Sequence, residues 1–137
     1  LSWECVLNKQ EAFRRAFDDF DWDKVAAYDE ARQAALYADP GIIRNRRKIA
    51  AAVGNAAVFA AIRQEFGSFD SYLWQWTGGK TLVERGPTTS PLSDAISKDL
   101  KKRGMKFVGS TIIYAYLQAV GVLYAHEPGC FLEKKCP

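Results

Sequence analysis

The stretch with the sharpest helix start and stop signals is 90–121, and it predicts two helices joined by a tight turn. Ser90 is a candidate N-cap, and Pro91 suits the first helical position after it. Gly104 ends this helix, Gly109 begins the second, and that helix ends near Gly121. Apolar residues at helical spacing are expected to face the core, namely Leu92, Ile96 and Leu100 in the first helix and Ile113, Leu117 and Val120 in the second.

The rest of the sequence also indicates short helices, so the expected fold class is all-α. Candidate N-caps for four further helices are Asn8, Asp21, Asp29 and Ser68. Asn8 and Glu11 have capping-box spacing, which places Phe13, Phe17 and Phe20 on one side of the first helix. An apolar stripe from Ile42 to Gly67 holds Ile49, Val53, Ala56 and Ala60. Residues 80–89 are expected to form a loop with at most a short extended piece.

Length and composition restrict the class of protein. With 137 residues, 48% of them apolar, we expect a single domain over residues 1–137. No stretch approaches the roughly 20 apolar residues of a membrane span, and the start does not resemble a signal peptide. The odd number of cysteines argues against a disulfide framework, so a cytoplasmic location is expected. The first residues lack Met, so we expect a chain cut from a longer protein; Cys5 is expected to be a small core residue.

The net charge of +3 is unevenly distributed. Residues 1–40 carry five basic and nine acidic side chains, whereas residues 41–106 carry twelve basic and five acidic ones. Such asymmetry suits a protein that meets a polyanion with one part of its surface. A basic cluster at Arg44, Arg46, Arg47 and Lys48 is either a solvated helix face with ion pairs or a DNA contact.

The turn between the two helices has the features of a helix-hairpin-helix DNA-binding element. Glycines let the backbone approach a phosphate, and the second helix offers free N–H groups and a positive dipole end. Such contacts hold DNA without reading its sequence. The alternative is an ordinary corner between helices with solvated lysines. The candidate DNA-binding residues are Lys102, Arg103, Gly104, Lys106, Gly109, Ser110 and Thr111.

Several motifs in order resemble the DNA-3-methyladenine glycosylase I family. They are Leu1-Ser2-Trp3, Gly41-Ile42-Ile43-Arg44-Asn45-Arg46-Arg47-Lys48-Ile49 with Asn55-Ala56, Gly67-Ser68-Phe69-Asp70, the run from Ser93 to Gly109, and His126 to Cys130. The resemblance covers essentially the whole chain. It implies an all-helical helix-hairpin-helix DNA glycosylase fold, here N-terminally truncated, with the helix-hairpin-helix element at about 91–121.

The resemblance also implies a reaction. It is hydrolysis of the N-glycosidic bond of 3-methyladenine in alkylated double-stranded DNA, by a monomer that flips the base. N3-methylation gives the base a positive charge, so the enzyme need not protonate it and has only to hold it and stabilise an oxocarbenium-like sugar. The hairpin lacks a Schiff-base lysine and the downstream Asp of many relatives, which favours a monofunctional hydrolase. The alternative is a non-catalytic DNA-binding module or an inactive fragment.

Trp3 is the expected base-binding residue. By resemblance it lines the pocket, where an indole face attracts a cationic purine by stacking and cation–π interaction. The alternative is a core tryptophan, and Trp22, Trp74 and Trp76 are interpreted as core or partly exposed packing residues. The family's functional Glu and two aromatic pocket residues fall upstream of Leu1, so no catalytic residue is predicted in this chain. Glu4 occupies the wrong place in the motif.

His126 and Cys130 are candidate metal ligands. Imidazole and thiolate both bind zinc, and a His-x-x-x-Cys spacing can bring them to one ion. The alternative is a buried His and a free thiol. The resemblance implies a structural zinc whose other two ligands come from an N-terminal arm, so half of the ligands are missing here. The zinc-ligand segment is about 126–130, and Cys136 is expected to be a free thiol.

Overall fold

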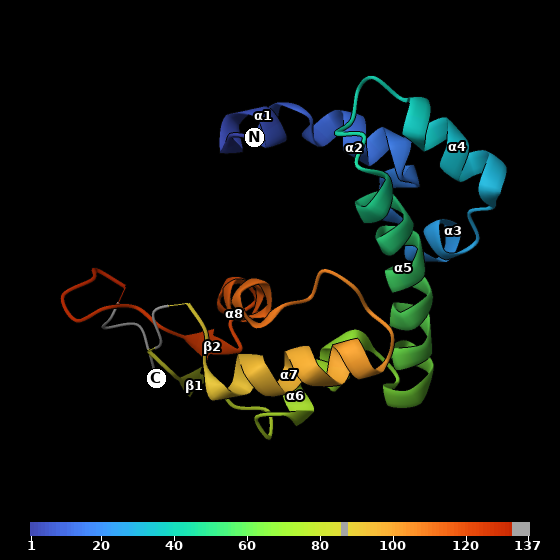
Figure 1. The fold of residues 1–137 in the computed structure, drawn as a ribbon. Coiled ribbons are helices and arrows are strands. Elements are labelled where there is room, and N and C mark those ends of the chain that lie inside the picture. The colour runs from blue at the N-terminus through green and yellow to red at the C-terminus, as the bar shows by residue number, and fades with distance from the viewer. Residues whose placement is uncertain (86–87, 133–137) are drawn as a thin grey trace. The chain divides into compact units, whose positions relative to one another are not determined.

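The computed structural model of the chain describes residues 1–85 and 88–132. The described residues are mostly helical, as Figure 1 shows, so the predicted all-α class is confirmed. They form two compact units, residues 1–61 and residues from 62 onward, and each is described by itself. A single domain over residues 1–137 stays a prediction. Among the described helices, none is long and apolar enough to cross a bilayer.

The first unit is built from short helices around one apolar cluster. They are α1 (Trp3–Asn8), α2 (Gln10–Ala16), the 3-10 turn η1 (Asp18–Phe20), α3 (Trp22–Ala26), α4 (Glu30–Ala38) and most of α5 (Arg46–Phe66). Asp21 and Asp29 cap α3 and α4 as predicted, and α4 ends at the expected place before Pro40. The cluster takes side chains from α2, α3, α4 and α5 and from the segments next to them, namely Ala16, Phe17, Val25, Leu36, Ile42, Ile49, Val53 and Ala56.

The beginning of the chain differs from the sequence prediction. The helix expected after Asn8 is α2, whose N-cap residue is Lys9 and makes no side-chain capping bond. A further helix, α1, precedes it and is capped by Ser2, whose Oγ accepts a hydrogen bond of 3.1 Å from the Cys5 N–H. The expected helix through Phe20 ends at Ala16 because residues 18–20 have left-handed φ angles of 51° to 59°. Phe20 is therefore exposed while Phe17 is buried. Cys5 is only partly buried, so its placement in the core was wrong.

The long helix α5 begins later than its apolar stripe suggests. The stripe was expected from Ile42, but the helix starts at Arg46. The Asn45 side chain explains the start, since its Oδ1 accepts a hydrogen bond of 3.1 Å from the Lys48 N–H. Gly67, with φ +84°, follows the last helical residue as predicted.

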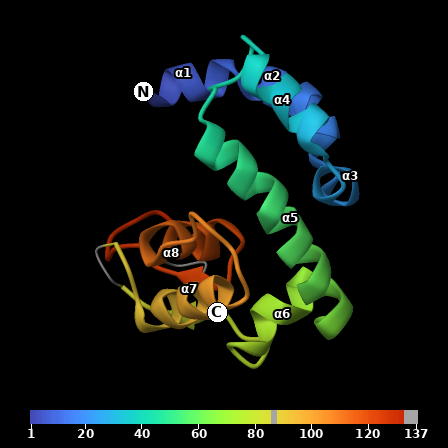
Figure 2. The same ribbon diagram turned by 45° about the vertical axis from the view of Figure 1, so that its right-hand side comes forward.

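The second unit places two helices side by side. It contains α6 (Phe69–Gln75), β1 (Leu82–Val83), α7 (Pro91–Lys102), α8 (Ser110–Ala119) and β2 (Leu123–Tyr124). Ser68 caps α6 as predicted. β1 and β2 pair in parallel, with Leu82 opposite Leu123, so the segment before α7 is fastened to the segment after α8. Figure 2 shows α7 and α8 next to each other, as Figure 1 does from another direction.

The start signals of α7 and α8 are confirmed. Ser90 and Ser93 form a reciprocal capping box, with Pro91 at the first helical position. Gly109 is the N-cap of α8. The expected apolar positions are buried with one exception, since Val120 is 43% exposed. Val120 lies one residue beyond the last helical residue, and Tyr114 is buried on α8 together with Ile113 and Leu117.

Candidate nucleic-acid interface and zinc-ligand pair

The loop between α7 and α8 begins with a glycine-dependent helix stop. Gly104 has φ +104°, a conformation that favours glycine. Its N–H donates to the Lys101 carbonyl and the Met105 N–H donates to the Leu100 carbonyl, each at 3.0 Å. These two bonds form the pattern of a Schellman motif, so the end of α7 is fixed by local geometry.

The N-terminus of α8 is open to an outside acceptor. The first backbone bond of the helix runs from the Ile113 N–H to the Gly109 carbonyl, at 3.0 Å. Among the described residues, no side chain caps this end. The preceding N–H groups lie at the positive end of the helix dipole, which suits a phosphate. Gly109 has an ordinary φ of −61°, and an added Cβ would meet nothing within 4 Å. Backbone conformation and packing against the described residues therefore do not require a glycine at this N-cap position.

Buried serines of α7 hold the end of the loop and the start of α8. Ser97 Oγ donates to the Val108 carbonyl at 2.7 Å. Ser93 Oγ lies 2.8 Å from Ser110 Oγ, whose hydroxyl donates to Asp94 Oδ1. The sequence predicts Ser110 as a hydroxyl donor to phosphate, but in the structure this hydroxyl donates to Asp94 within the hairpin. Thr111 is exposed at the next position.

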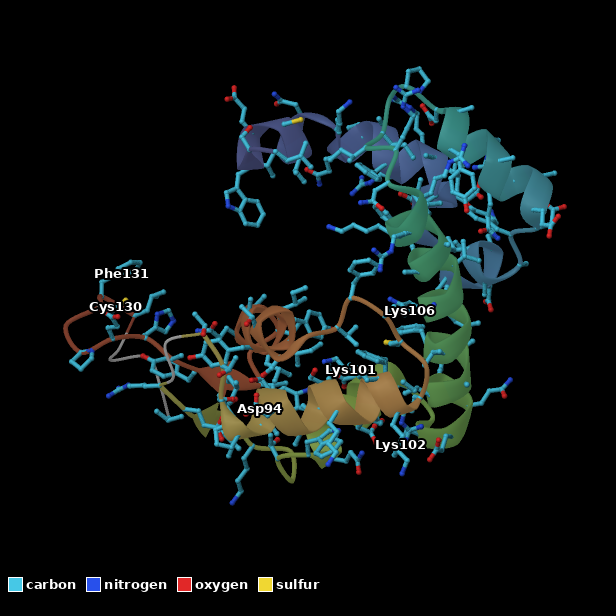
Figure 3. The ribbon with its side chains drawn as sticks, in the orientation of Figure 1. Asp94, Lys101, Lys102, Lys106, Cys130 and Phe131 are labelled. Carbon is cyan, nitrogen blue, oxygen red and sulfur yellow. The ribbon has the colours of Figure 1, made fainter. Side chains whose placement is uncertain are left out.

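Three basic side chains of the hairpin are exposed, and Figure 3 labels their positions on α7 and the loop after it. Lys101 and Lys102 lie on the last turn of α7, and Lys106 lies on the loop that follows. Lysines at the C-terminal end of a helix also interact favourably with its dipole. Lys102 and Lys106 are thus accessible from solvent, and their contact with a polyanion stays a prediction.

Arg103 differs from its lysine neighbours. Its Nε donates to Asp99 Oδ2 at 2.8 Å, and NH1 donates to Glu65 Oε2 at 2.7 Å. The guanidinium also lies 5.2 Å from the Phe66 ring centroid and 5.4 Å from that of Tyr72. Arg103 was predicted to supply charge to DNA, whereas here its charge is compensated within the chain by two carboxylates.

The acceptor at the centre of this cluster is Asp99. Its Oδ2 also accepts a hydrogen bond of 2.6 Å from the hydroxyl of Tyr72, which is fully buried. Burial alone would raise the pKa of Asp99, but the hydrogen bonds from Tyr72 and Arg103 outweigh it and lower that pKa. Burial, together with the bond to Asp99, raises the pKa of Tyr72. Asp99 therefore stays ionised and Tyr72 stays protonated at neutral pH.

Trp3 is exposed on α1, with 83% of its surface accessible. It is therefore not part of the core of the first unit. The other tryptophans are partly exposed, as predicted: Trp22 packs on Phe59, and Trp74 donates through Nε1 to Asp70 at 3.0 Å. Glu4 is exposed beside Trp3. Arg44, Arg46, Arg47 and Lys48 are also exposed, and the Arg46 guanidinium lies over the Tyr37 ring.

His126 and Cys130 lie close enough to share a metal ion. Cys130 Sγ is 3.6 Å from His126 Nδ1. Zinc bonds of about 2.0–2.1 Å to nitrogen and 2.3 Å to sulfur, at a tetrahedral angle, separate the two ligand atoms by about 3.5 Å. The observed pair thus fits half of a zinc site. Within residues 1–85 and 88–132 no cluster of three or more His, Cys, Asp or Glu side chains forms, and Cys136 lies outside the described residues.

Several residues around the hairpin were missed by the sequence interpretation. The buried serines of α7 are the clearest case, because Ser93 and Ser97 lie four residues apart, the spacing of the apolar residues Leu92, Ile96 and Leu100. That spacing is a signal that the sequence carries. The partnership of Arg103 with Glu65 has no such signal, because 38 residues separate the two.

The chain is similar to known proteins of one family. A model of the methyladenine glycosylase family matches residues 1–133. DNA-3-methyladenine glycosylase 1 of Escherichia coli strain K12 is 43% identical over 136 residues, which is 95% of this chain and 73% of that protein. DNA-3-methyladenine glycosylase of Haemophilus influenzae is 36% identical over 136 residues, 95% of this chain and 74% of that protein.

A solved structure leads to the same family. It is a variant of 3-methyladenine DNA glycosylase I in complex with 3-methyladenine, with a TM-score of 0.86 and 34% identity. The match covers 96% of this chain and 74% of that one. The sequence motifs, the helical fold and these likenesses agree along nearly the entire chain. The chain belongs to the methyladenine glycosylase family.

Proposed function

We propose that this protein hydrolyses the N-glycosidic bond of 3-methyladenine in alkylated DNA. The observation that carries the proposal is the family match over residues 1–133, with 43% identity to a relative named for this activity. A solved relative named for its complex with 3-methyladenine supports the same base as the ligand.

The proposed reaction leaves an abasic site and does not cut the strand. The methylated base already carries a positive charge, so its departure needs no proton from the protein. The protein has to extrude the nucleotide, hold the base and stabilise positive charge that develops on the sugar. The proposal names no residue of this chain as the catalytic group.

In this proposal the hairpin grips the backbone of double-stranded DNA. The open N–H groups of α8 bind a phosphate, and Gly104 and Gly109 allow its close approach. Lys102 and Lys106 add charge, and Thr111 adds a hydroxyl donor. Such contacts are independent of base sequence, so the protein can scan DNA for a damaged base.

Trp3 is the proposed contact for the flipped base. A cationic methylated purine is attracted to an indole face by stacking and by the ring quadrupole. The support is the high exposure of Trp3, which leaves its ring outside the core of the first unit. Its role is thus distinct from the backbone grip of the hairpin.

His126 and Cys130 are the proposed ligands of a structural zinc ion. Their separation of 3.6 Å suits two adjacent positions of a tetrahedral shell. Bound zinc would supply folding energy by tying its ligands together, and it would take no part in the reaction. Metal analysis of the intact protein should find zinc that is lost in Cys130→Ser. Equal zinc content in the variant would exclude Cys130 as a ligand.

The activity is tested by incubating the intact protein that carries these 137 residues with methylated duplex DNA. The expected result is release of free 3-methyladenine and abasic sites that break only on heating or in alkali. A nicked strand formed without such treatment would contradict the monofunctional reaction. Duplex binding without release of any base would instead identify a non-catalytic DNA-binding protein.

A further inference from the structure

We propose that Arg103 is a positioning residue that holds the hairpin in its DNA-binding form and does not itself contact a phosphate. The inference rests on the proposed function. It departs from the sequence, in which Lys101, Lys102 and Arg103 are three equivalent cations ahead of the loop.

The contacts of Arg103 tie the start of the loop to three helices. The residue is the C-cap of α7, directly before Gly104, where the chain turns away. Its guanidinium meets Glu65 and Phe66 at the end of α5, Tyr72 of α6, and Asp99 of α7 itself. The serine contacts of Val108 and Ser110 hold the other end of the loop. Both ends of the loop between α7 and α8 are therefore held by contacts within the protein.

The charge of this cluster argues against a direct role in phosphate binding. Arg103 is bonded to two carboxylates, so the group of three carries a net charge of about −1 at neutral pH. A phosphate at this guanidinium would also face Asp99 and Glu65. Only 25% of the Arg103 side chain is accessible, whereas Lys101 and Lys102 are exposed.

A fixed loop matters because phosphate binding depends on the direction in which the N–H groups of α8 point. The N–H groups at the start of α8 bind one phosphate only when they point to it together, and holding them in place beforehand lowers the ordering cost of binding. Lysine cannot replace arginine in this task. It carries the same charge, but it lacks the planar fork that spans two carboxylates and lies flat over two rings.

The test is salt-dependent binding of undamaged duplex DNA to the intact protein. Arg103→Lys should weaken binding about 5- to 30-fold, as expected when one or two charge-assisted hydrogen bonds no longer hold the loop. The slope of log K against log salt concentration should not change, because no phosphate contact is lost. Lys102→Gln is the matched control, and it should lower that slope by about 1.

Asp99→Asn separates positioning from a simple charge effect, because the two predict opposite changes in DNA affinity. Removing a negative charge near the hairpin should tighten DNA binding if charge alone matters. The positioning role predicts weaker binding, because Arg103 and Tyr72 lose their ionised acceptor. Amide exchange of α8 should be faster in both Arg103→Lys and Asp99→Asn than in Lys102→Gln.

The outcomes separate this inference from the proposed function. Wild-type affinity in Arg103→Lys, with a slope lowered by about 1 in Arg103→Gln, would make Arg103 a phosphate contact and overturn the inference. If Arg103→Lys fails to fold, Tyr72→Phe decides, since it keeps the ring and removes one bond to Asp99. A smaller loss of affinity at unchanged slope supports positioning, and wild-type affinity contradicts it. A wild-type protein that does not bind duplex DNA would instead refute the proposed function.

Discussion

The helix N-termini of α5 and α8 are built in opposite ways. α5 is capped by the side chain of Asn45 and carries the cations Arg46, Arg47 and Lys48 in its first turn. α8 begins at Ser110, its N-cap residue Gly109 has no side chain to make a capping bond, and its first turn contains no charged residue. Cations oppose the dipole at a helix start, whereas an uncapped start is available to an anion. The difference teaches that a basic run does not by itself locate a phosphate site.

The hairpin lysines complete the comparison. Lys101 and Lys102 stand at the C-terminal end of α7, where a positive charge stabilises the helix. Their place in the sequence thus has a structural explanation as well as a functional one. The cations of α5 have no such explanation in the dipole of their own helix, and their contact with DNA stays an open prediction.

The largest expected effect lies at Trp3, which belongs to neither helix start. Trp3→Ala should lower excision of 3-methyladenine roughly 5- to 150-fold, because one stacked base is worth about 1–3 kcal/mol. Non-specific duplex affinity should hardly change. Titration of undamaged duplex and an excision assay measure the two quantities. If Trp3→Ala and Lys102→Gln lost duplex affinity equally, holding the base and gripping the backbone would not be separate tasks.

Gly109 tests the open start of α8. Gly109→Ala should lower duplex affinity about tenfold or more, equal to about 1.4 kcal/mol, because a methyl group would block the close approach of a phosphate. Stability should be nearly unchanged, since the added Cβ meets nothing within 4 Å and the φ of −61° suits any residue. Chemical denaturation and duplex titration give the two numbers. A stable variant with full affinity would show that no phosphate approaches this position.

The two basic runs can be separated by salt dependence. Lys102→Gln should lower the salt slope of duplex binding by about 1, as for the loss of one phosphate contact. Arg47→Gln should show the same change only if the start of α5 also contacts DNA. An unchanged slope in Arg47→Gln would assign that run to the solvated surface and confine the grip to the hairpin.

The smallest expected effects are on stability, and they have opposite signs. Arg47→Gln removes a cation from a helix start and should stabilise the first unit by about 0.3–1 kcal/mol at low salt. Lys102→Gln removes one from a helix end and should destabilise the second unit by a similar amount. Denaturation in low and high salt checks both, because each effect should fade as salt is added. Changes of the same sign would contradict the dipole argument.

The sequence by itself determined where the two helices of the hairpin begin and end, and to which family the chain belongs. Ser90, Pro91, Gly104 and Gly109 act within a turn or two of their own position, so their effect can be read from neighbouring residues. The motifs that resemble the family were likewise contiguous runs, and the comparisons confirmed them along nearly the whole chain. The spacing of His126 and Cys130 similarly anticipated a pair within reach of one ion.

Only the tertiary structure decided which side chains hold the hairpin in place through contacts within the protein. Arg103 meets Glu65 across 38 residues, and Tyr72 meets Asp99 across 27, so no local pattern distinguishes Arg103 from Lys102. The periodic pattern of apolar residues also did not predict the left-handed conformation of residues 18–20 or the exposure of Val120. Helix starts and ends are set by hydrogen bonds between near neighbours. The partner of a long charged side chain is set by which helices pack together, and packing is a property of the whole unit.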